Sequence, residues 1–321
     1  MGKKYKNLMQ QIIDPANMAL AYKKALDGKR ASVGALQFKE YAQVNLLNLT
    51  HEIATGSYTV GEFHKFKVYE PKEREISALP FRDRIAQHAL VNVLSPIFER
   101  TFLPMSYACR VGKGTHKGAI KAQSIMRRLA KNGEVYCLKM DFSKYFKSID
   151  RAVLHKQINK KIACKPTLDL IEKFTPKEGK GLPIGNLTSQ LYANVYGTIV
   201  DRLLTQTLKV KNAVRYMDDT VIFSNDSDYL KHIQKEFEAL IKHITRLEFS
   251  RWSIQNINRG VNFLGYRIWA THKLIRKNSV KSAKRKILKL KGEKLDRFIA
   301  AWKGHIQHAN TNNLQQSLGV I

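Results

Sequence analysis

The sequence is poor in cysteine and lacks the long apolar runs of membrane proteins. Its three cysteines, Cys109, Cys137 and Cys164, lie far apart and form no metal-ligand spacing. So sparse and odd a count indicates a reducing compartment and gives no support for a zinc site. No apolar run is long enough to span a bilayer, and no signal-peptide pattern is present. We therefore predict a cytoplasmic protein with no membrane partner.

Acidic residues are scarce as well. The 26 Asp and Glu are outnumbered by 56 Lys and Arg, which gives a formal net charge of +30 over 321 residues. This excess predicts a polyanionic partner, with nucleic acid as the first candidate and an anionic membrane as the second. The hydrophobic share of 44% is ordinary for a folded protein. The length allows two or three domains or subdomains around a real core.

What the chain does contain is a pair of adjacent acids inside an apolar stretch. Apolar and β-branched residues flank Asp218 and Asp219 in Ala213–Phe223, which predicts a β-hairpin with the acids at or beside its turn. Two carboxylates this close repel each other, so the pair favours a bound divalent metal. Taken alone, the pair is better explained as a solvated turn, because Asp is a common turn residue. The metal interpretation therefore depends on a third carboxylate.

A third carboxylate ends an earlier strand. Alternation over Val135–Asp141 places Cys137, Lys139 and Asp141 on one face, with Asp141 at the strand's end. Three acids on strand ends suit two-metal phosphoryl transfer, in which Mg²⁺ ions roughly 4 Å apart activate a 3′-hydroxyl and stabilise the leaving pyrophosphate. Few protein carboxylates suffice, because Mg²⁺ keeps waters or substrate phosphates in its shell. The carbonyl of Phe142 is a further candidate ligand.

Basic segments accompany these acids. A hairpin is predicted over residues 63–79, with Lys72 and Arg74 at its tip. These cations could neutralise a triphosphate, and a turn that is simply solvated explains them about equally well. A glycine-rich basic loop at residues 110–117 precedes a helix and suits phosphate. Residues 271–303 carry 12 Lys or Arg against 2 acids. They predict basic amphipathic helices that contact a phosphate backbone.

Apolar spacing predicts the remaining elements. We expect Asn17 to cap a helix that Gly28 ends, and Asn186 to cap another after a close backbone approach at Gly185. A strand with a glycine kink is predicted over Phe263–Trp269. Further helices are predicted over residues 36–53, 81–98, 118–130 and 228–247, with an apolar stripe in the tail formed by Val280, Ile287, Leu288, Leu295 and Phe298.

The order of these motifs resembles that of reverse transcriptases. Tyr216-Met217-Asp218-Asp219 is similar to the reverse-transcriptase form of the polymerase catalytic hairpin. Before it come the basic hairpin, Asp141 with Phe146 five residues on, and Leu182-Pro-Ile-Gly185 with its helix, and after it comes Phe263-Leu-Gly-Tyr266. The resemblance covers about residues 60–270. It implies an α+β, right-hand polymerase fold with fingers, a palm that contains an antiparallel sheet, and a helical thumb.

A narrower resemblance concerns Gly185-Asn-Leu-Thr-Ser189-Gln190. Group II intron and retron enzymes usually carry Ser-Pro at this place, whereas Gly-x-x-x-Ser-Gln resembles the reverse transcriptases of diversity-generating retroelements. The segments Arg82-Asp-Arg84 and Ser106-Tyr-Ala-Cys-Arg110 are similar to that group as well. This resemblance implies error-prone copying opposite template adenine, a structured template RNA, and a small accessory protein in a bacterial or phage-infected cell.

The resemblance also implies roles for single residues. Asp141, Asp218 and Asp219 would be catalytic and would bind two Mg²⁺ ions, for which Mn²⁺ is a possible substitute, with Phe142 as a further ligand. Lys72 and Arg74 would contact the triphosphate of a deoxynucleotide, Phe146 would exclude a ribose 2′-hydroxyl, and Ile184 and Gln190 would line the nascent base pair. Primer and template would contact Arg110, Tyr216, Met217, Gly265, Tyr266, Lys284 and Arg285.

Two positions depart from the wider pattern. Many reverse transcriptases have Gln where this chain has Ile184, and an apolar side chain cannot hydrogen-bond the incoming nucleotide. We hypothesise that Ile184 relaxes base selection, and simple packing against Tyr216 or Phe146 is the alternative. In Phe249–Ile254, where related enzymes often carry Lys, this chain has Arg251 and Trp252.

The sequence therefore predicts an RNA-directed DNA polymerase in three parts. These are an N-terminal helical segment with fingers at 1–134, a palm at 135–270 with a fingers return segment at about 151–184, and a basic helical thumb at 271–321. Its partners would be template RNA, primer or cDNA, deoxynucleotides and the accessory protein. The alternatives are a retron or stand-alone group II intron-like reverse transcriptase, and a non-catalytic RNA-binding module of polymerase ancestry.

Overall fold

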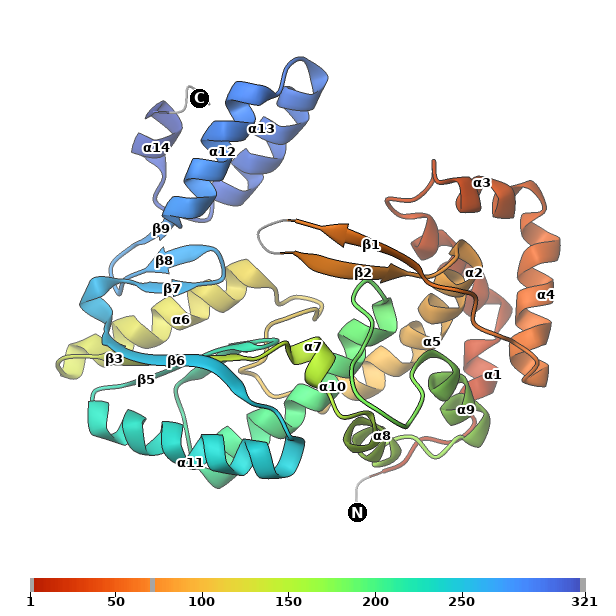
Figure 1. The fold of residues 1–321 in the computed structure, drawn as a ribbon, viewed down its shortest axis with the longest axis horizontal. Helices are drawn as coiled ribbons and strands as arrows, with labels where there is room; N and C mark the ends of the chain where they lie inside the picture. Colours follow the sequence, from red (N-terminus) through yellow and green to blue (C-terminus); the bar gives the residue numbers. More distant parts are fainter. Residues whose placement is uncertain (1–2, 70–72, 318–321) are drawn as a thin grey trace. The chain divides into compact units, whose positions relative to one another are not determined.

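The computed structural model describes residues 3–69 and 73–317 and forms two compact units (Figure 1). Unit 1 consists of the described residues of Met1–Leu103, Lys144–Val200 and Lys242–Leu247. Unit 2 consists of Pro104–Ser143, Asp201–Ile241 and the described residues of Glu248–Ile321. Both units are therefore assembled from separate stretches of the chain. The division into fingers, palm and thumb stays a prediction.

Unit 1 is mainly helical and contains one β-hairpin. The strands of the hairpin, β1 and β2, pair only with each other in the described chain. The elements of this unit are α1 (Leu8–Ile12), α2 (Pro15–Leu26), α3 (Val33–Glu40), α4 (Ala42–Thr55), β1 (His64–Val68), β2 (Arg74–Ala78), α5 (Phe81–Glu99), α7 (Tyr145–Ser148), α8 (Arg151–Asn159), α9 (Lys165–Phe174) and most of α10 (Leu187–Arg202).

Two expectations for the N-terminal helices are wrong. Asp14, not Asn17, caps α2, because the Asp14 carboxylate accepts hydrogen bonds from the amides of Ala16 and Asn17. The helix predicted over residues 36–53 is two helices that meet at Tyr41. The apolar spacing was misleading there, because Tyr41, Val44 and Leu47 are exposed.

Unit 2 contains two antiparallel sheets and the helices around them. Its elements are α6 (Thr115–Leu129), the 3₁₀ turns η1 (Ala130–Asn132) and η3 (Ile257–Arg259), the π-helical turn η2 (Leu203–Thr207), β3 (Tyr136–Phe142), β4 (Ala213–Tyr216), β5 (Asp219–Ser224), most of α11 (Ser227–Thr245), β6 (Phe249–Asn256), β7 (Val261–Phe263), β8 (Tyr266–Ile268), β9 (Lys273–Ile275), α12 (Lys277–Lys289), α13 (Glu293–Ile306) and α14 (Asn312–Ser317).

The larger sheet has four antiparallel strands in the order β4-β5-β3-β6. Alternate residues of β3 and β5 face one core, in which Cys137, Val221 and Phe223 pack with side chains of α6 such as Ile125 and Met126. Helix α11 runs along the sheet on the side away from α6 (Figure 1). The two central strands, β3 and β5, carry Asp141 and Asp219.

The segment predicted as one kinked strand is a hairpin. Strands β7 and β8 turn at Leu264 and Gly265, both of which have positive φ, and β9 completes a three-stranded sheet. The predicted basic helices follow as α12 and α13, although Leu288 of the expected apolar stripe is 84% exposed. None of the helices in the described part of the chain is long and apolar enough to cross a membrane.

Candidate functional site

The paired acids lie at the turn of the β4–β5 hairpin, as the sequence predicts. Strand β4 ends at Tyr216, the turn contains Met217 and Asp218, and β5 begins with Asp219. Met217 has φ 54°, a left-handed conformation that is unusual for a residue with a side chain. Met217 is also buried, with only 7% of its surface exposed. Contacts from neighbouring residues must therefore hold the turn in this conformation.

Arg215 supplies this support from within β4. Its guanidinium donates to both carboxylate oxygens of Asp201, at 2.5 and 2.8 Å, and to the carbonyl of Met217 at 3.1 Å. The Arg215 and Asp201 side chains are 1% and 0% exposed. A bidentate, buried pair of this kind has a fixed geometry, so it fixes the backbone of the turn that presents Asp218 and Asp219.

The sheet register brings the third acid to this hairpin. Asp141 of β3 is directly opposite Asp219 of β5 in the antiparallel ladder. Directly opposite residues point to the same face with their Cβ atoms about 5 Å apart. The carboxylates of Asp141 and Asp219, from separate strands, are therefore neighbours on one face of the sheet. Asp218 precedes Asp219 in the chain. The adjacent Phe142 ring is buried and stacks on Phe249, with ring centroids 4.8 Å apart.

Two cations contact these carboxylates. Lys139 Nζ lies 3.1 Å from Asp219 Oδ2 and also donates to the carbonyl of Asn262 at 2.7 Å. Arg251 Nε lies 3.6 Å from Asp141 Oδ2, because β6 places Arg251 opposite Asp141. Burial raises the pKa of Asp219, while Lys139 opposes this shift. The site thus confines negative charge that an added cation would stabilise.

The donor set is suited to Mg²⁺, a metal that the sequence resemblance implies. As the side chains stand, residues 3–69 and 73–317 contain no group of three or more His, Cys, Asp or Glu that could hold a metal ion. However, Asp219 Oδ1 is buried and has no hydrogen-bond partner among the described residues. The available donors are carboxylate oxygens, which Mg²⁺ prefers. An orphaned carboxylate oxygen beside a second carboxylate fits a hard divalent cation.

A cavity of about 230 Å³ opens beside the acids in unit 2. Asp141, Lys139 and Arg251 line it together with Arg276 and the backbone region of Asn262. Cations outnumber acids on its walls, so the cavity favours an anionic occupant. The predicted metal ligand Asp141 and an electropositive space are therefore adjacent in one unit.

In unit 1, backbone hydrogen bonds link the segments that carry several of the predicted nucleotide-binding residues. Ser77 of β2 donates to the carbonyl of Ile184 at 2.8 Å, and Leu182 donates to the carbonyl of Phe146 at 2.8 Å. At Gly185, where φ is +114°, an added Cβ would lie 2.8 Å from Ile76 Cγ2. The predicted close approach is thus present. Strand β2 with Arg74, the Leu182–Gly185 loop and α7 form one connected group.

The other predicted contact residues occupy different environments. Gln190 is exposed on α10, Lys284 and Arg285 are exposed on α12, and Arg110 bonds the carbonyl of Ser106 at 2.8 Å. Tyr266 is 0% exposed and its hydroxyl lies 2.6 Å from His116 Nδ1, so any primer contact there would use the backbone near Gly265. Half-buried Tyr216 precedes the turn. Lys72 lies outside the described residues.

The sequence of residues 64–268 matches the family model described as reverse transcriptase (RNA-dependent DNA polymerase). This match covers more than half of the chain and includes the three acids, β2 and the Leu182–Gly185 loop. The chain belongs to the reverse transcriptase family. The predicted enzyme class, RNA-directed DNA polymerase, is thereby confirmed.

This reverse transcriptase is also similar to named proteins and to a solved structure. It is 25% identical to the protein YkfC of Escherichia coli, over 92% of this chain and 89% of that protein. It is 24% identical to the group II intron-encoded protein LtrA of Lactococcus lactis, over 76% of this chain but only 43% of that protein. A structure of Candida albicans telomerase in complex with a telomeric RNA fragment matches with a TM-score of 0.51 at 12% identity, over 73% of this chain and 52% of that one. The predicted right-hand polymerase fold is confirmed.

Sequence reasoning missed the residues that support the two hairpins of this reverse transcriptase. Arg215 and Asp201 form the buried pair behind the β4–β5 turn, and Asp83 lies at the base of the β1–β2 hairpin. One signal was available for Arg215, since a charged residue between the apolar Val214 and Tyr216 in a buried strand requires a buried partner. The identity of that partner depends on tertiary structure.

Proposed function

We propose that this reverse transcriptase adds deoxynucleotides to a primer by a two-metal mechanism, with Asp141, Asp218 and Asp219 as the metal ligands. The observation that supports this most directly is the register of β3 and β5, which pairs Asp141 with Asp219. The orphaned Oδ1 atom of Asp219 gives that pair a vacant coordinating atom. Bound Mg²⁺ would supply Lewis-acid activation of the 3′-hydroxyl and stabilisation of the leaving pyrophosphate.

The chain's own residues would do the binding and the orientation. Arg215 would hold the turn so that Asp218 and Asp219 keep one geometry. Arg74 would neutralise the triphosphate, and Phe146 would exclude a ribose 2′-hydroxyl. In the same proposal Lys139 and Arg251 are the cations that contact Asp219 and Asp141 until a metal ion binds.

Primer extension tests the metal ligands. The variant with Asp218→Asn and Asp219→Asn should lose extension by about 10³-fold or more, because amide groups bind Mg²⁺ poorly. Binding of a labelled primer–template duplex should change little, since the basic tail is intact. Extension that survives in the double variant would overturn the assignment. A matched control is Asp226→Asn, an exposed acid that follows β5, which should remain fully active.

We further propose that the copied product is the adenine-mutagenised cDNA of a diversity-generating retroelement, made with an accessory protein. The support is Ser189-Gln190 in place of Ser-Pro, together with Ile184 in place of Gln. Sequencing of cDNA copied by wild type and by Ile184→Gln tests this proposal. Misincorporation opposite adenine should fall several-fold in the variant. Equal misincorporation would remove the role of Ile184.

A stand-alone group II intron-like reverse transcriptase is the second candidate. The similarity to LtrA favours it. The same cDNA sequencing separates the two candidates, because this second one predicts that wild type copies adenine as faithfully as the other bases. A cognate RNA flanked by an imperfect repeat that differs at adenines would favour the retroelement.

A further inference from the structure

The β1–β2 hairpin has few contacts that could fix its direction. Every residue of β1 is exposed, and β2 pairs only with β1 among the described strands. One further hold on β2 is the contact of Ile76 and Ser77 with the Leu182–Gly185 loop. Arg74 lies opposite Val68, at the end of the ladder that is distant from the chain's entry and exit.

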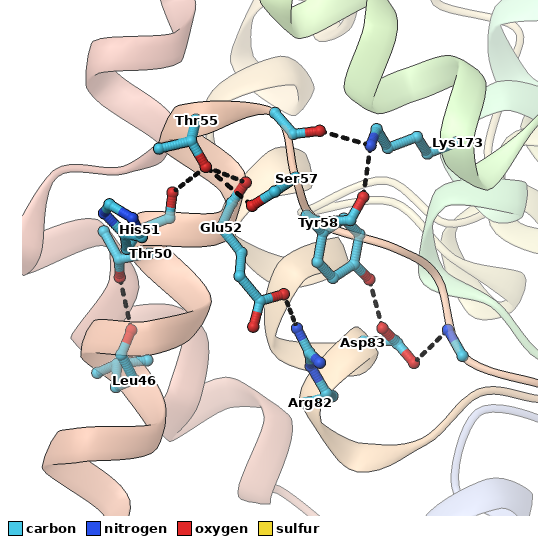
Figure 2. Close-up of polar contacts among 12 residues, drawn as sticks. Leu46, Thr50, His51, Glu52, Thr55, Ser57, Tyr58, Arg82, Asp83 and Lys173 are labelled. Atoms are coloured by element: carbon cyan, nitrogen blue, oxygen red, sulfur yellow. Dashed lines mark hydrogen bonds and ion pairs between the residues drawn. The ribbon is translucent and has the colours of Figure 1, made fainter.

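A single carboxylate ties together the two ends of this hairpin. Tyr58 and Gly61 precede β1, and Asp83 follows β2. The Tyr58 hydroxyl donates to Asp83 Oδ1, and the Gly61 amide donates to Asp83 Oδ2 at 3.2 Å. Figure 2 shows Tyr58 and Asp83 directed at each other across the base of the hairpin. Because Asp83 and Tyr58 are both 0% exposed, water does not compete for these bonds.

The residues around the Tyr58–Asp83 hydrogen bond restrict its movement. Lys173 of α9 donates to the carbonyl of Gly56 at 2.8 Å and to that of Tyr58 (Figure 2). The Tyr58 ring packs against Phe174, with centroids 5.8 Å apart. At Gly61 an added Cβ would lie 2.8 Å from Asp83 Oδ2. The base of the hairpin is therefore fixed to the helical part of unit 1.

The Tyr58 hydroxyl stays protonated and so remains a hydrogen-bond donor to Asp83. Burial, followed by the hydrogen bond to Asp83, raises the pKa of Tyr58, so the phenol keeps its proton at any physiological pH. The Asp83 carboxylate accepts two hydrogen bonds inside the protein, and while burial raises the pKa of Asp83, these bonds oppose that rise. Arg82 forms an ion pair with Glu52 in the same corner (Figure 2), and its guanidinium lies 5.5 Å from the centre of the Tyr58 ring. That pair joins α5 to α4 and supplies neither of the two hydrogen bonds that Asp83 accepts.

We propose that Asp83, with Tyr58 as its donor, is a positioning residue for deoxynucleotide binding that sets the direction of the β1–β2 hairpin and hence the place of Arg74. This inference rests on the role proposed above for Arg74. From Ala78 to Arg74 the strand advances four residues, roughly 13 Å. A rotation of about 5° at the base therefore moves Arg74 by about 1 Å, and a misplacement of this size costs up to about 100-fold in rate.

The test is steady-state primer extension by the full chain at saturating primer–template with varied deoxynucleotide. Asp83→Asn keeps the shape of the side chain but places an amide NH2 group where one of the two carboxylate oxygens accepts a hydrogen bond, so it should raise the deoxynucleotide KM about 10-fold. The kcat should stay within about 3-fold. Tyr58→Phe should act in the same direction by a smaller factor. The matched control Glu52→Gln, which breaks the neighbouring pair, should leave this KM unchanged.

A double-mutant cycle with Arg74→Ala separates positioning from a general structural role. If Asp83 acts through Arg74, Asp83→Asn should add less than about 2-fold to KM once Arg74 is absent. An additive increase, or no increase in the single variant, would overturn the inference. If Arg74→Ala itself leaves KM unchanged, the proposed role of Arg74 is the part that fails. Should Asp83→Asn not fold, Tyr58→Phe carries the same cycle.

Discussion

The two hairpins of this reverse transcriptase are built in opposite ways. In β4–β5, the first three residues of β4 and the four central residues of β5 are buried, and β5 pairs on both sides. In β1–β2, every residue of β1 is exposed and the ladder has no third strand among the described residues. One hairpin is a fixed part of a sheet, whereas the other is held at its base and along one strand.

This difference follows from the groups that each hairpin presents. The β4–β5 turn presents carboxylates, which repel each other and, under the proposed mechanism, would have to keep one geometry to share metal ions. It therefore has a buried ion pair behind it. The β1–β2 hairpin presents Arg74 at the exposed end of its ladder, so the place of Arg74 depends on the supports at the base of the hairpin and beside β2. Variants that break the support of either hairpin should show whether the β4–β5 turn is rigid and whether the direction of the β1–β2 hairpin depends on its base.

The largest effect should come from the support of the catalytic turn. Arg215→Met leaves Asp201 buried without its partner, which should cost about 3–5 kcal/mol in the free energy of unfolding. Chemical denaturation measures this loss, and extension activity should fall with it. The double variant with Asp201→Leu should recover most of the stability, because it removes the unpaired charge. It should not recover activity, since the Met217 carbonyl still lacks its donor. A loss below about 1 kcal/mol would contradict the role given to the pair.

An intermediate effect is expected where β2 meets its neighbouring loop. Gly185→Ala places a Cβ 2.8 Å from Ile76 Cγ2 at a backbone φ of +114°. The combined strain should cost about 1–3 kcal/mol and should raise the deoxynucleotide KM, because β2 must shift. The control is Gly28→Ala, at φ +69° with no atom within 4 Å, which should lose stability without any change in KM. Equal kinetics in both variants would show that the loop does not set the position of β2.

A smaller effect should appear in the metal dependence. Lys139 Nζ lies 3.1 Å from Asp219 Oδ2, so its charge opposes a metal ion on the same carboxylate. Lys139→Met should lower the Mg²⁺ concentration for half-maximal extension by about 3- to 10-fold. Lys139→Arg, which keeps the charge, should stay close to wild type. A higher Mg²⁺ requirement in Lys139→Met would instead mean that Lys139 orients Asp219.

The sequence was sufficient to predict the β4–β5 hairpin and the place of its paired acids, because their signals are local. Alternation, turn composition and paired acids place Asp218 and Asp219 without knowledge of the fold, and strand alternation places Asp141 on the matching face. The supports depend on residues distant in sequence. Arg215 and Asp201 meet through a helix and a sheet, and Tyr58 and Asp83 meet across a whole hairpin. No local pattern specifies such partners.

The same reasoning explains the incorrect expectations. Helical spacing of Tyr41, Val44 and Leu47 predicted a buried face, yet Val44 and Leu47 are exposed on α4 and Tyr41 is exposed where α3 and α4 meet. Periodicity identifies a stripe but does not identify what covers it. The Gly265 signal was interpreted as a kink within one strand, although a positive φ at Leu264 as well as Gly265 makes it a turn between two strands. In both cases tertiary contacts decide the outcome.

The smallest effect is expected for Val68→Thr, one member of a matched pair of valines in the two hairpins. Val221 of β5 is 0% exposed and Val68 of β1 is 39% exposed. Val221→Thr buries a hydroxyl in the core of unit 2 and should cost about 1–3 kcal/mol in the free energy of unfolding. Val68→Thr leaves the hydroxyl in water and should stay within about 0.5 kcal/mol of wild type. Similar losses from both substitutions would mean that β1 is covered in solution, and that the hairpin with Arg74 is held by more than its base and one loop.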